Sequence, residues 1–154
     1  MEMPKPGEPH RRLQRLVGSW SGEERMHPSP WDPAGGTALG RVENREALDG
    51  FVVVQDYAQE RAGRVTFRGH GVFSWDAPRR SYVFHWFDSM GMPPNEYVGQ
   101  FQGDVLTLSY QGPQGHSRAV FDLTQAGRYA FRMDFSPDGA TWQTLMEGSY
   151  LRRP

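Results

Sequence analysis

From residue 95 onward, the chain alternates apolar and polar positions with the period of two that is typical of half-buried β-strands. Turn signals such as Gly103-Asp104 and Pro137-Asp138-Gly139 separate these stretches. One predicted face is apolar or aromatic at nearly every position: Tyr97, Phe101, Leu106, Leu108, Tyr110, Ala119, Phe121, Phe131, Met133, Phe135, Trp142, Thr144, Met146 and Tyr150. The intervening positions are mostly polar. The second half of the chain therefore predicts consecutive antiparallel strands that share one apolar wall.

Similar turn signals divide the rest of the chain after residue 18 into short strands. The predicted strands cover residues 19–27, 38–48, 51–60, 64–75, 80–88, 95–102, 105–111, 116–125, 129–136 and 141–151. Only residues 8–17 have a helical pattern, and residues 1–7 are expected to be flexible. Ten antiparallel strands leave two exposed edges unless the sheet closes. The sequence therefore predicts an all-β, up-and-down barrel in a single domain spanning 1–154, with the helix closing one end beside Trp20.

Strands between residues 38 and 88 leave the choice of inner face open. One face carries Val42, Asn44, Glu46, Leu48, Phe51, Val53, Gln55, Tyr57, Arg68, His70, Val72, Val83, His85 and Phe87. The other face carries four charged residues in its first two strands, which favours the first face as the interior. Phe84 and Trp86, opposite Gly71 and Gly69, favour the reverse, and a bulge at either glycine would exchange the faces.

Two histidines are the main candidates for chemistry. If the hairpin of residues 68–88 turns between Ala77 and Pro78, His70 lies directly opposite His85, with Cβ atoms about 4.5–5.5 Å apart. With Glu46 on the same predicted face, the pair could bind a divalent metal. A neutral imidazole could instead act as a general acid or base, with Glu46 or Tyr57 assisting. Two further interpretations assign no chemistry to the histidines. They either contact a ligand, or they are hydrogen-bonded or solvent-facing residues of the strands.

Composition removes several classes of function. The chain has 154 residues, a net charge of −1 and 23% charged residues. It therefore lacks the positive electrostatic field that would hold nucleic acid or an anionic membrane. It has no cysteine, which excludes disulfides and thiolate chemistry. No stretch has the apolar length of a signal peptide or a membrane span. We therefore expect a soluble, cytoplasmic protein.

Two motifs carry a resemblance to known barrels. Gly18-Ser19-Trp20 after a short helix resembles the G-x-W motif of calycins, the superfamily of lipocalins and fatty-acid-binding proteins. In those barrels an arginine of the last strand packs over the tryptophan ring, and Arg152 and Arg153 stand where it would be. The run from Trp86 to Gly91 (WFDSMG) resembles the W-x-D-S-M-G signature of an uncharacterised bacterial family of calycin-like barrels. This resemblance spans about residues 11–153 and implies the lipocalin-like fold.

A more distant resemblance is to nitrobindin-type haem barrels, which share the helix leading into the first strand. Their haem-ligating histidine lies near the C-terminus, whereas the last histidine here is His116. The resemblance would imply haem only if His70 or His85 supplied the axial ligand.

Loops and the first strand add smaller expectations. Asp88 and Ser89 are expected to cap a turn that Gly91 completes, with Met90 and Met92 at the mouth of a pocket as the functional alternative. Trp31, in a proline-rich loop, either covers the cavity or packs on the outer wall. Residues 23–25 read as a solvated strand face, although Glu24 lies on the same side as Trp20.

These observations predict that the barrel binds or carries a small hydrophobic or amphipathic molecule. The expected ligand-binding residues are Gln55, Tyr57, His70, His85, Tyr97, Phe101, Tyr110, Phe131, Met133 and Trp142. The first alternative is an enzyme of lyase or isomerase type, with His70, His85 and Glu46 as candidate catalytic residues. Others are a haem- or metal-binding barrel and a filled barrel with no cavity. No resident cofactor is predicted, and the oligomeric state is open between monomer and homodimer.

Overall fold

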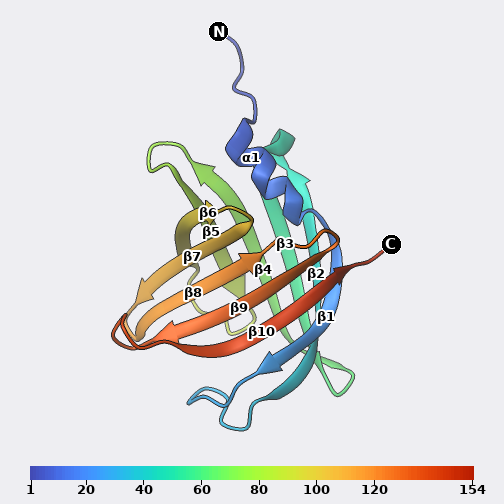
Figure 1. Cartoon of the computed structure of the whole chain (residues 1–154), viewed down its shortest axis with the longest axis vertical. Helices are drawn as coiled ribbons and strands as arrows, with labels where there is room; N and C mark the ends of the chain where they lie inside the picture. The colour runs from blue at the N-terminus through green and yellow to red at the C-terminus, as the bar shows by residue number, and fades with distance from the viewer.

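Ten antiparallel strands follow one another around a closed barrel in which the first strand pairs with the last (Figure 1). The computed structural model describes all residues, 1–154. Its elements are α1 (Glu8–Leu13), η1 (Gln14–Leu16), β1 (Gly18–Met26), β2 (Gly36–Ala47), η2 (Leu48–Gly50), β3 (Val52–Arg61), β4 (Arg64–Asp76), β5 (Ser81–Asp88), β6 (Asn95–Gln102), β7 (Val105–Gly112), β8 (Gly115–Asp122), β9 (Arg128–Ser136) and β10 (Gln143–Arg152). The predicted fold class is confirmed. No helix has the length and apolarity needed to cross a membrane.

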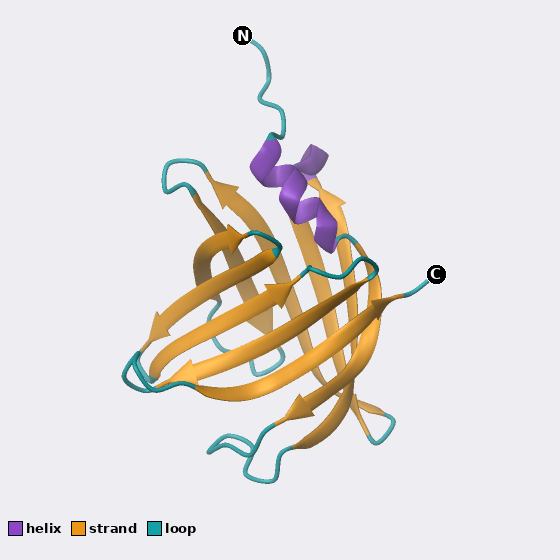
Figure 2. Cartoon of the chain, viewed as in Figure 1, coloured by secondary structure: helices purple, strands orange, loops and turns teal.

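The N-terminal helix lies across one end of the barrel (Figure 2). Leu13 and Leu16 are 1% and 0% exposed, since both join the hydrophobic core. The Tyr82 hydroxyl donates to the Pro9 carbonyl at 2.8 Å, and the Arg15 guanidinium bonds Asp104 and the Leu123 carbonyl, each at 2.8 Å. These bonds join the helix to three hairpins of the barrel, so this end is closed.

Gly18, Trp20 and Arg152 explain the G-x-W motif. Arg152 lies over the Trp20 ring at 4.3 Å and donates to the Val17 carbonyl at 2.7 Å, which confirms the arginine expected from the resemblance. The Trp20 indole donates to the Leu16 carbonyl at 2.9 Å. Gly18 has φ +146°, and a Cβ there would lie 2.3 Å from the Arg152 guanidinium. Only glycine meets both constraints.

A bulge in β4 makes the preferred choice of inner face wrong for β4 and β5. Glu60 pairs with Val65 and Gln59 with Phe67, so Thr66 is an extra residue in β4. One extra residue exchanges the two faces of a strand. The inner face therefore continues from Gln55 and Tyr57 of β3 onto the alternate residues of β4 and β5, which are Gly69, Gly71, Phe73, Phe84 and Trp86.

A second bulge lies at Leu145 in β10, because Thr144 pairs with Asp134 and Met146 with Met133. On the N-terminal side of this bulge, Thr144 faces the outside of the barrel, where its hydroxyl donates to the Asp134 carboxylate at 2.9 Å. Trp142 stacks on Arg118, with 4.0 Å between the guanidinium and the ring. The expectation that Trp142 faces the interior is therefore wrong.

Candidate functional site

The barrel contains a cavity of about 300 Å³ between the helix and the opposite end. Seventeen residues line it: Val42, Gln55, Tyr57, Phe67, Phe84, Trp86, Asp88, Asn95, Tyr97, Ser117, Ala119, Phe121, Tyr129, Phe131, Met133, Met146 and Tyr150. Asp88 ends β5 and Asn95 begins β6, so the cavity extends to the end of the barrel that the helix leaves uncovered. The volume falls at the lower end of the range for small-molecule sites.

A fully buried carboxylate lies behind the cavity wall. Glu24 is 0% exposed and accepts hydrogen bonds from three side chains. The Tyr57 hydroxyl donates to both carboxylate oxygens at 2.7 and 2.6 Å, Gln59 donates at 3.0 Å, and the Tyr150 hydroxyl donates to Oε2. A buried carboxylate needs such donors because it has lost its water. The cluster joins β1, β3 and β10 around Glu24.

Glycines make the space for this cluster. A Cβ at Gly40 would lie 2.4 Å from Glu24 Oε2, and one at Gly148 would lie 2.6 Å from the Tyr150 hydroxyl. Distances below about 3 Å do not occur for real Cβ atoms, so side chains at these two positions would displace the carboxylate or the tyrosine. Glu24, Gly40 and Gly148 therefore form one structural unit.

The tyrosines around the cavity keep their protons. Burial, followed by the neighbouring Glu24 carboxylate, raises the pKa of Tyr57 and of Tyr150 far above the ordinary value. The same two causes raise the pKa of Tyr129. Burial raises the pKa of Tyr97 to about 12. At neutral pH these side chains are neutral phenols, so none is a base.

The W-x-D-S-M-G segment forms the rim of the cavity. The Trp86 indole donates to Asp88 Oδ2 at 2.9 Å, and the Met90 amide donates to Asp88 Oδ1 at 3.0 Å. The Ser89 hydroxyl accepts from the Arg68 amide at 3.0 Å, and Gly91 has φ +74°. The capping role expected for Asp88 and the positive φ expected for Gly91 are confirmed, whereas the Ser89 hydroxyl joins the turn to the neighbouring strand β4. Asp88 also lines the cavity, so the motif both closes the turn and contributes a carboxylate to the mouth.

Two rim loops carry exposed apolar side chains. Met90 and Met92 are 73% and 69% exposed. Trp31 is 54% exposed and packs edge-on against Phe135, with ring centroids 4.8 Å apart. Its loop is held by an ion pair between Asp32 and Arg61 at 2.8 Å.

The prediction that His70 and His85 face each other is wrong. The β4–β5 turn takes four residues, so His70 pairs with Phe87 and His85 with Val72. Because of the Thr66 bulge, both imidazoles lie on the outer face, where each meets its own acid. His70 Nδ1 is 2.7 Å from Asp56, and His85 Nε2 is 3.2 Å from Glu96.

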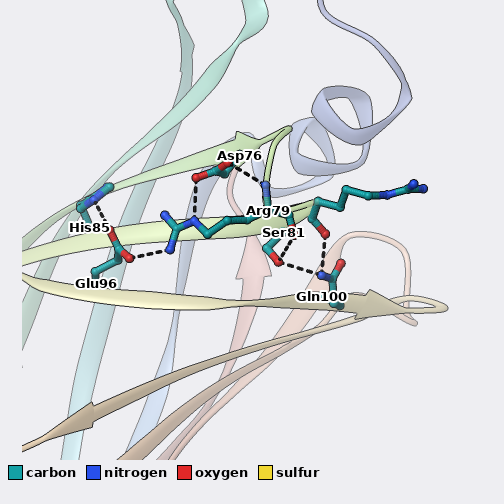
Figure 3. Close-up of polar contacts among 7 residues, drawn as sticks. Asp76, Arg79, Ser81, His85, Glu96 and Gln100 are labelled. Atoms are coloured by element: carbon teal, nitrogen blue, oxygen red, sulfur yellow. Dashed lines mark hydrogen bonds and ion pairs between the residues drawn. The ribbon is translucent and has the colours of Figure 1, made fainter.

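Figure 3 shows the second of these contacts in a surface network, in which Arg79 bridges Glu96 and Asp76. The third catalytic candidate, Glu46, is also exposed. None of the three candidates lines the cavity. The structure contains no group of three or more His, Cys, Asp or Glu side chains arranged to hold a metal.

Of the other predicted ligand-binding residues, five line the cavity: Gln55, Tyr57, Tyr97, Phe131 and Met133. Phe101 belongs to the packed core, and Arg12 of the helix lies over its ring at 5.6 Å. Tyr110 packs against Tyr97 at 5.5 Å between ring centroids but does not line the cavity.

The sequence analysis missed most of the polar residues at the site. Among the polar residues that line the cavity, Asn95, Ser117, Tyr129 and Tyr150 were not assigned to a ligand, and Asp88 was expected to cap a turn, with a loop at the pocket mouth as the alternative. Residues 23–25 were expected to form a solvated face, with an inward Glu24 as the alternative, and the structure supports the alternative for Glu24. The signal was its spacing: Glu24 lies four residues after Trp20, so the two side chains share one face of β1.

Fold and cavity together define a calycin-like β-barrel with an internal pocket. The chain belongs to the family described as "Protein of unknown function (DUF1579)", whose model matches residues 5–152. No curated protein matches the sequence.

Two solved structures are similar to this barrel. The crystal structure of Rv2717c from M. tuberculosis superposes with a TM-score of 0.73 at 14% identity, covering 97% of this chain and 100% of that one. The S-type phycobiliprotein lyase CPES from Guillardia theta superposes with a TM-score of 0.63 at 10% identity, covering 96% and 94%. At these identities the likeness establishes the fold.

Proposed function

We propose that this protein binds a small, largely apolar molecule in the barrel cavity. The observation that carries the proposal is Gln55, which is 5% exposed and lines the cavity, where its side-chain amide makes no hydrogen bond within the protein. The amide is open to the cavity, so its donors and its acceptor are free for a molecule that enters. A ligand with a matching polar group would bond it there.

The wall around Gln55 supports the same proposal. Phe84, Phe121 and Phe131 line the cavity together with Met133 and Met146. An apolar wall with few polar groups suits a ligand whose body is hydrophobic and whose orientation depends on one polar end. A filled barrel does not fit, because the cavity measures about 300 Å³.

Neither the enzyme nor the haem alternative gains support from the geometry. Both depended on His70 or His85 acting inside the barrel, and both histidines lie on its outer face. No other histidine lines the cavity, so no imidazole is available there for proton transfer or for axial ligation of haem.

Titration with the neutral dye N-phenylnaphthylamine tests the proposal, since the dye becomes fluorescent in apolar surroundings. Ala119→Leu adds volume to the cavity wall, and the matched Ala130→Leu adds the same volume at an exposed position of β9. We expect Ala119→Leu to weaken dye binding at least about tenfold and Ala130→Leu to leave it unchanged.

Circular dichroism checks that each variant is folded. If Ala119→Leu does not fold, Ser117→Leu, nearer the open end, replaces it. Absence of dye binding to the wild type, or equal binding to all variants, would contradict the proposal.

A further inference from the structure

The cavity wall has a one-sided charge. Asp88 is the only Asp, Glu, Lys, Arg or His among its seventeen residues, and the carboxylate of Glu24 lies behind the wall. No arginine, lysine or histidine lines the cavity. An anionic group entering this space would lose water and gain no cation in return.

The buried hydroxyls strengthen this bias, because their protons are already used. Tyr57 and Tyr150 both donate to Glu24, and Tyr57 also accepts a hydrogen bond from Gln59 at 3.1 Å. A phenol has one proton and two lone pairs. These two side chains therefore have no proton left to donate to an anionic ligand.

Aromatic rings near the mouth of the cavity add further groups that favour a cation over an anion. Phe84 lies 5.7 Å from Trp86 and 6.4 Å from Tyr97, measured between ring centroids, and all three line the cavity beside Asp88. The faces of such rings attract cations. The Asp88 carboxylate accepts one hydrogen bond on each oxygen, from Trp86 and from Met90, and keeps further acceptor sites.

We propose that the ligand is an organic cation, an apolar molecule with a protonated amine whose N–H groups meet Asp88 and the aromatic faces at the cavity mouth. This inference rests on the proposed function and adds the charge of the ligand to it. It excludes fatty acids and other carboxylates as ligands of the cavity.

Three probes with one apolar body test the inference: phenylbutylamine, phenylbutanol and phenylvalerate, titrated at neutral pH by isothermal calorimetry. They differ only in carrying a positive, a neutral or a negative end. We expect the amine to bind about tenfold more tightly than the acid, with the alcohol between them.

Asp88→Asn removes the charge and leaves one acceptor oxygen for the Trp86 and Met90 donors, while Asp56→Asn is a matched change at an exposed position on the outer face. Asp88→Asn should abolish the preference for the amine over the alcohol, whereas Asp56→Asn should leave that preference as in the wild type. Residual binding of the alcohol reports that the Asp88→Asn variant is folded.

Equal affinity for the three probes, or tightest binding of the acid, would overturn the charge assignment and leave the proposed function standing. Equal weakening of all three probes by Asp88→Asn would overturn it too, since Asp88 would then act through the shape of the mouth. Failure of every probe to bind the wild type would overturn the proposed function as well.

Discussion

The hydroxyl of Tyr150 donates a hydrogen bond to the carboxylate of Glu24, and this bond joins the last strand of the barrel to the first in a place without access to water. The same carboxylate accepts bonds from Tyr57 and Gln59 of β3. Three strands thus depend on one ionisable group. A network of this kind is stable only when all of its members are paired.

Tyr150→Phe should lower the free energy of unfolding by about 1–3 kcal/mol, because it removes one donor from a buried carboxylate. Tyr110→Phe is the matched control, since the Tyr110 hydroxyl has no hydrogen-bond partner, and it should change stability by less than about 0.5 kcal/mol. Urea unfolding measures both. Equal stability of the two variants would show that the bond to Glu24 contributes nothing.

Glu24→Gln should also destabilise the barrel, although it keeps the shape of the side chain. The new amide places an N–H among the Tyr57, Tyr150 and Gln59 donors, so at least one donor loses its acceptor, at a cost of about 1–3 kcal/mol. A double-mutant cycle with Tyr150→Phe measures the coupling. Additive effects of the two substitutions would contradict a shared network.

Arg152→Ala should lower the melting temperature more than Arg153→Ala. Arg152 stacks on Trp20 and bonds the Val17 carbonyl, contacts together expected to contribute about 1–2 kcal/mol. Arg153 contributes only its backbone amide, which bonds the Ser19 carbonyl and survives the substitution. Thermal unfolding of the two variants compares them, and similar melting temperatures would contradict a role for the stack.

Asp134 should make stability depend on pH. Burial alone would raise the pKa of this carboxyl, but hydrogen bonds from Arg132, Arg118 and Thr144 outweigh it and hold the pKa below its ordinary value. A lowered folded-state pKa stabilises the protein above the unfolded-state pKa, and this contribution is lost as pH falls through the folded value.

Asp134→Asn should therefore reduce stability at neutral pH, by about 1–2 kcal/mol, and flatten its dependence on pH below about 4. Asp56→Asn, at an exposed carboxylate, serves as the control. Urea unfolding across this pH range gives both quantities, and parallel pH profiles for wild type and Asp134→Asn would contradict the assignment.

His70→Gln combined with His85→Gln should leave the affinity for N-phenylnaphthylamine within about twofold of wild type, because both imidazoles lie outside the barrel. Dye titration checks this. A large loss of binding would mean that the outer face of β4 and β5 communicates with the cavity.

The fold was largely predictable because the alternation of apolar and polar residues is regular in β6 to β9. The G-x-W motif also led to the stack of Arg152 on Trp20. The interior of β4 and β5 was harder to predict, because a single unpaired residue, Thr66, reverses the faces and leaves no trace in composition. The bulge at Leu145 had the same effect on Trp142.

The candidate site was predictable only where it follows the strand pattern. Gln55, Tyr57 and Tyr97 lie on inward positions of regular strands, so their place in the cavity could be read from the spacing. Glu24 also lies on an inward position of its strand, but the spacing alone did not decide its orientation, because a carboxylate on a strand is usually solvated. Its burial depends on hydroxyls from strands 33 and 126 residues further along the chain.

The pairing of β1 with β10 bears on how the protein is made. A ribosome releases Trp20 and Glu24 long before it adds Tyr150 and Arg152, so a growing chain has an open sheet with two unpaired edges. Contacts between such distant residues form slowly. The cavity therefore cannot be closed before β10 has been synthesised, and partly made chains should need protection from aggregation until then.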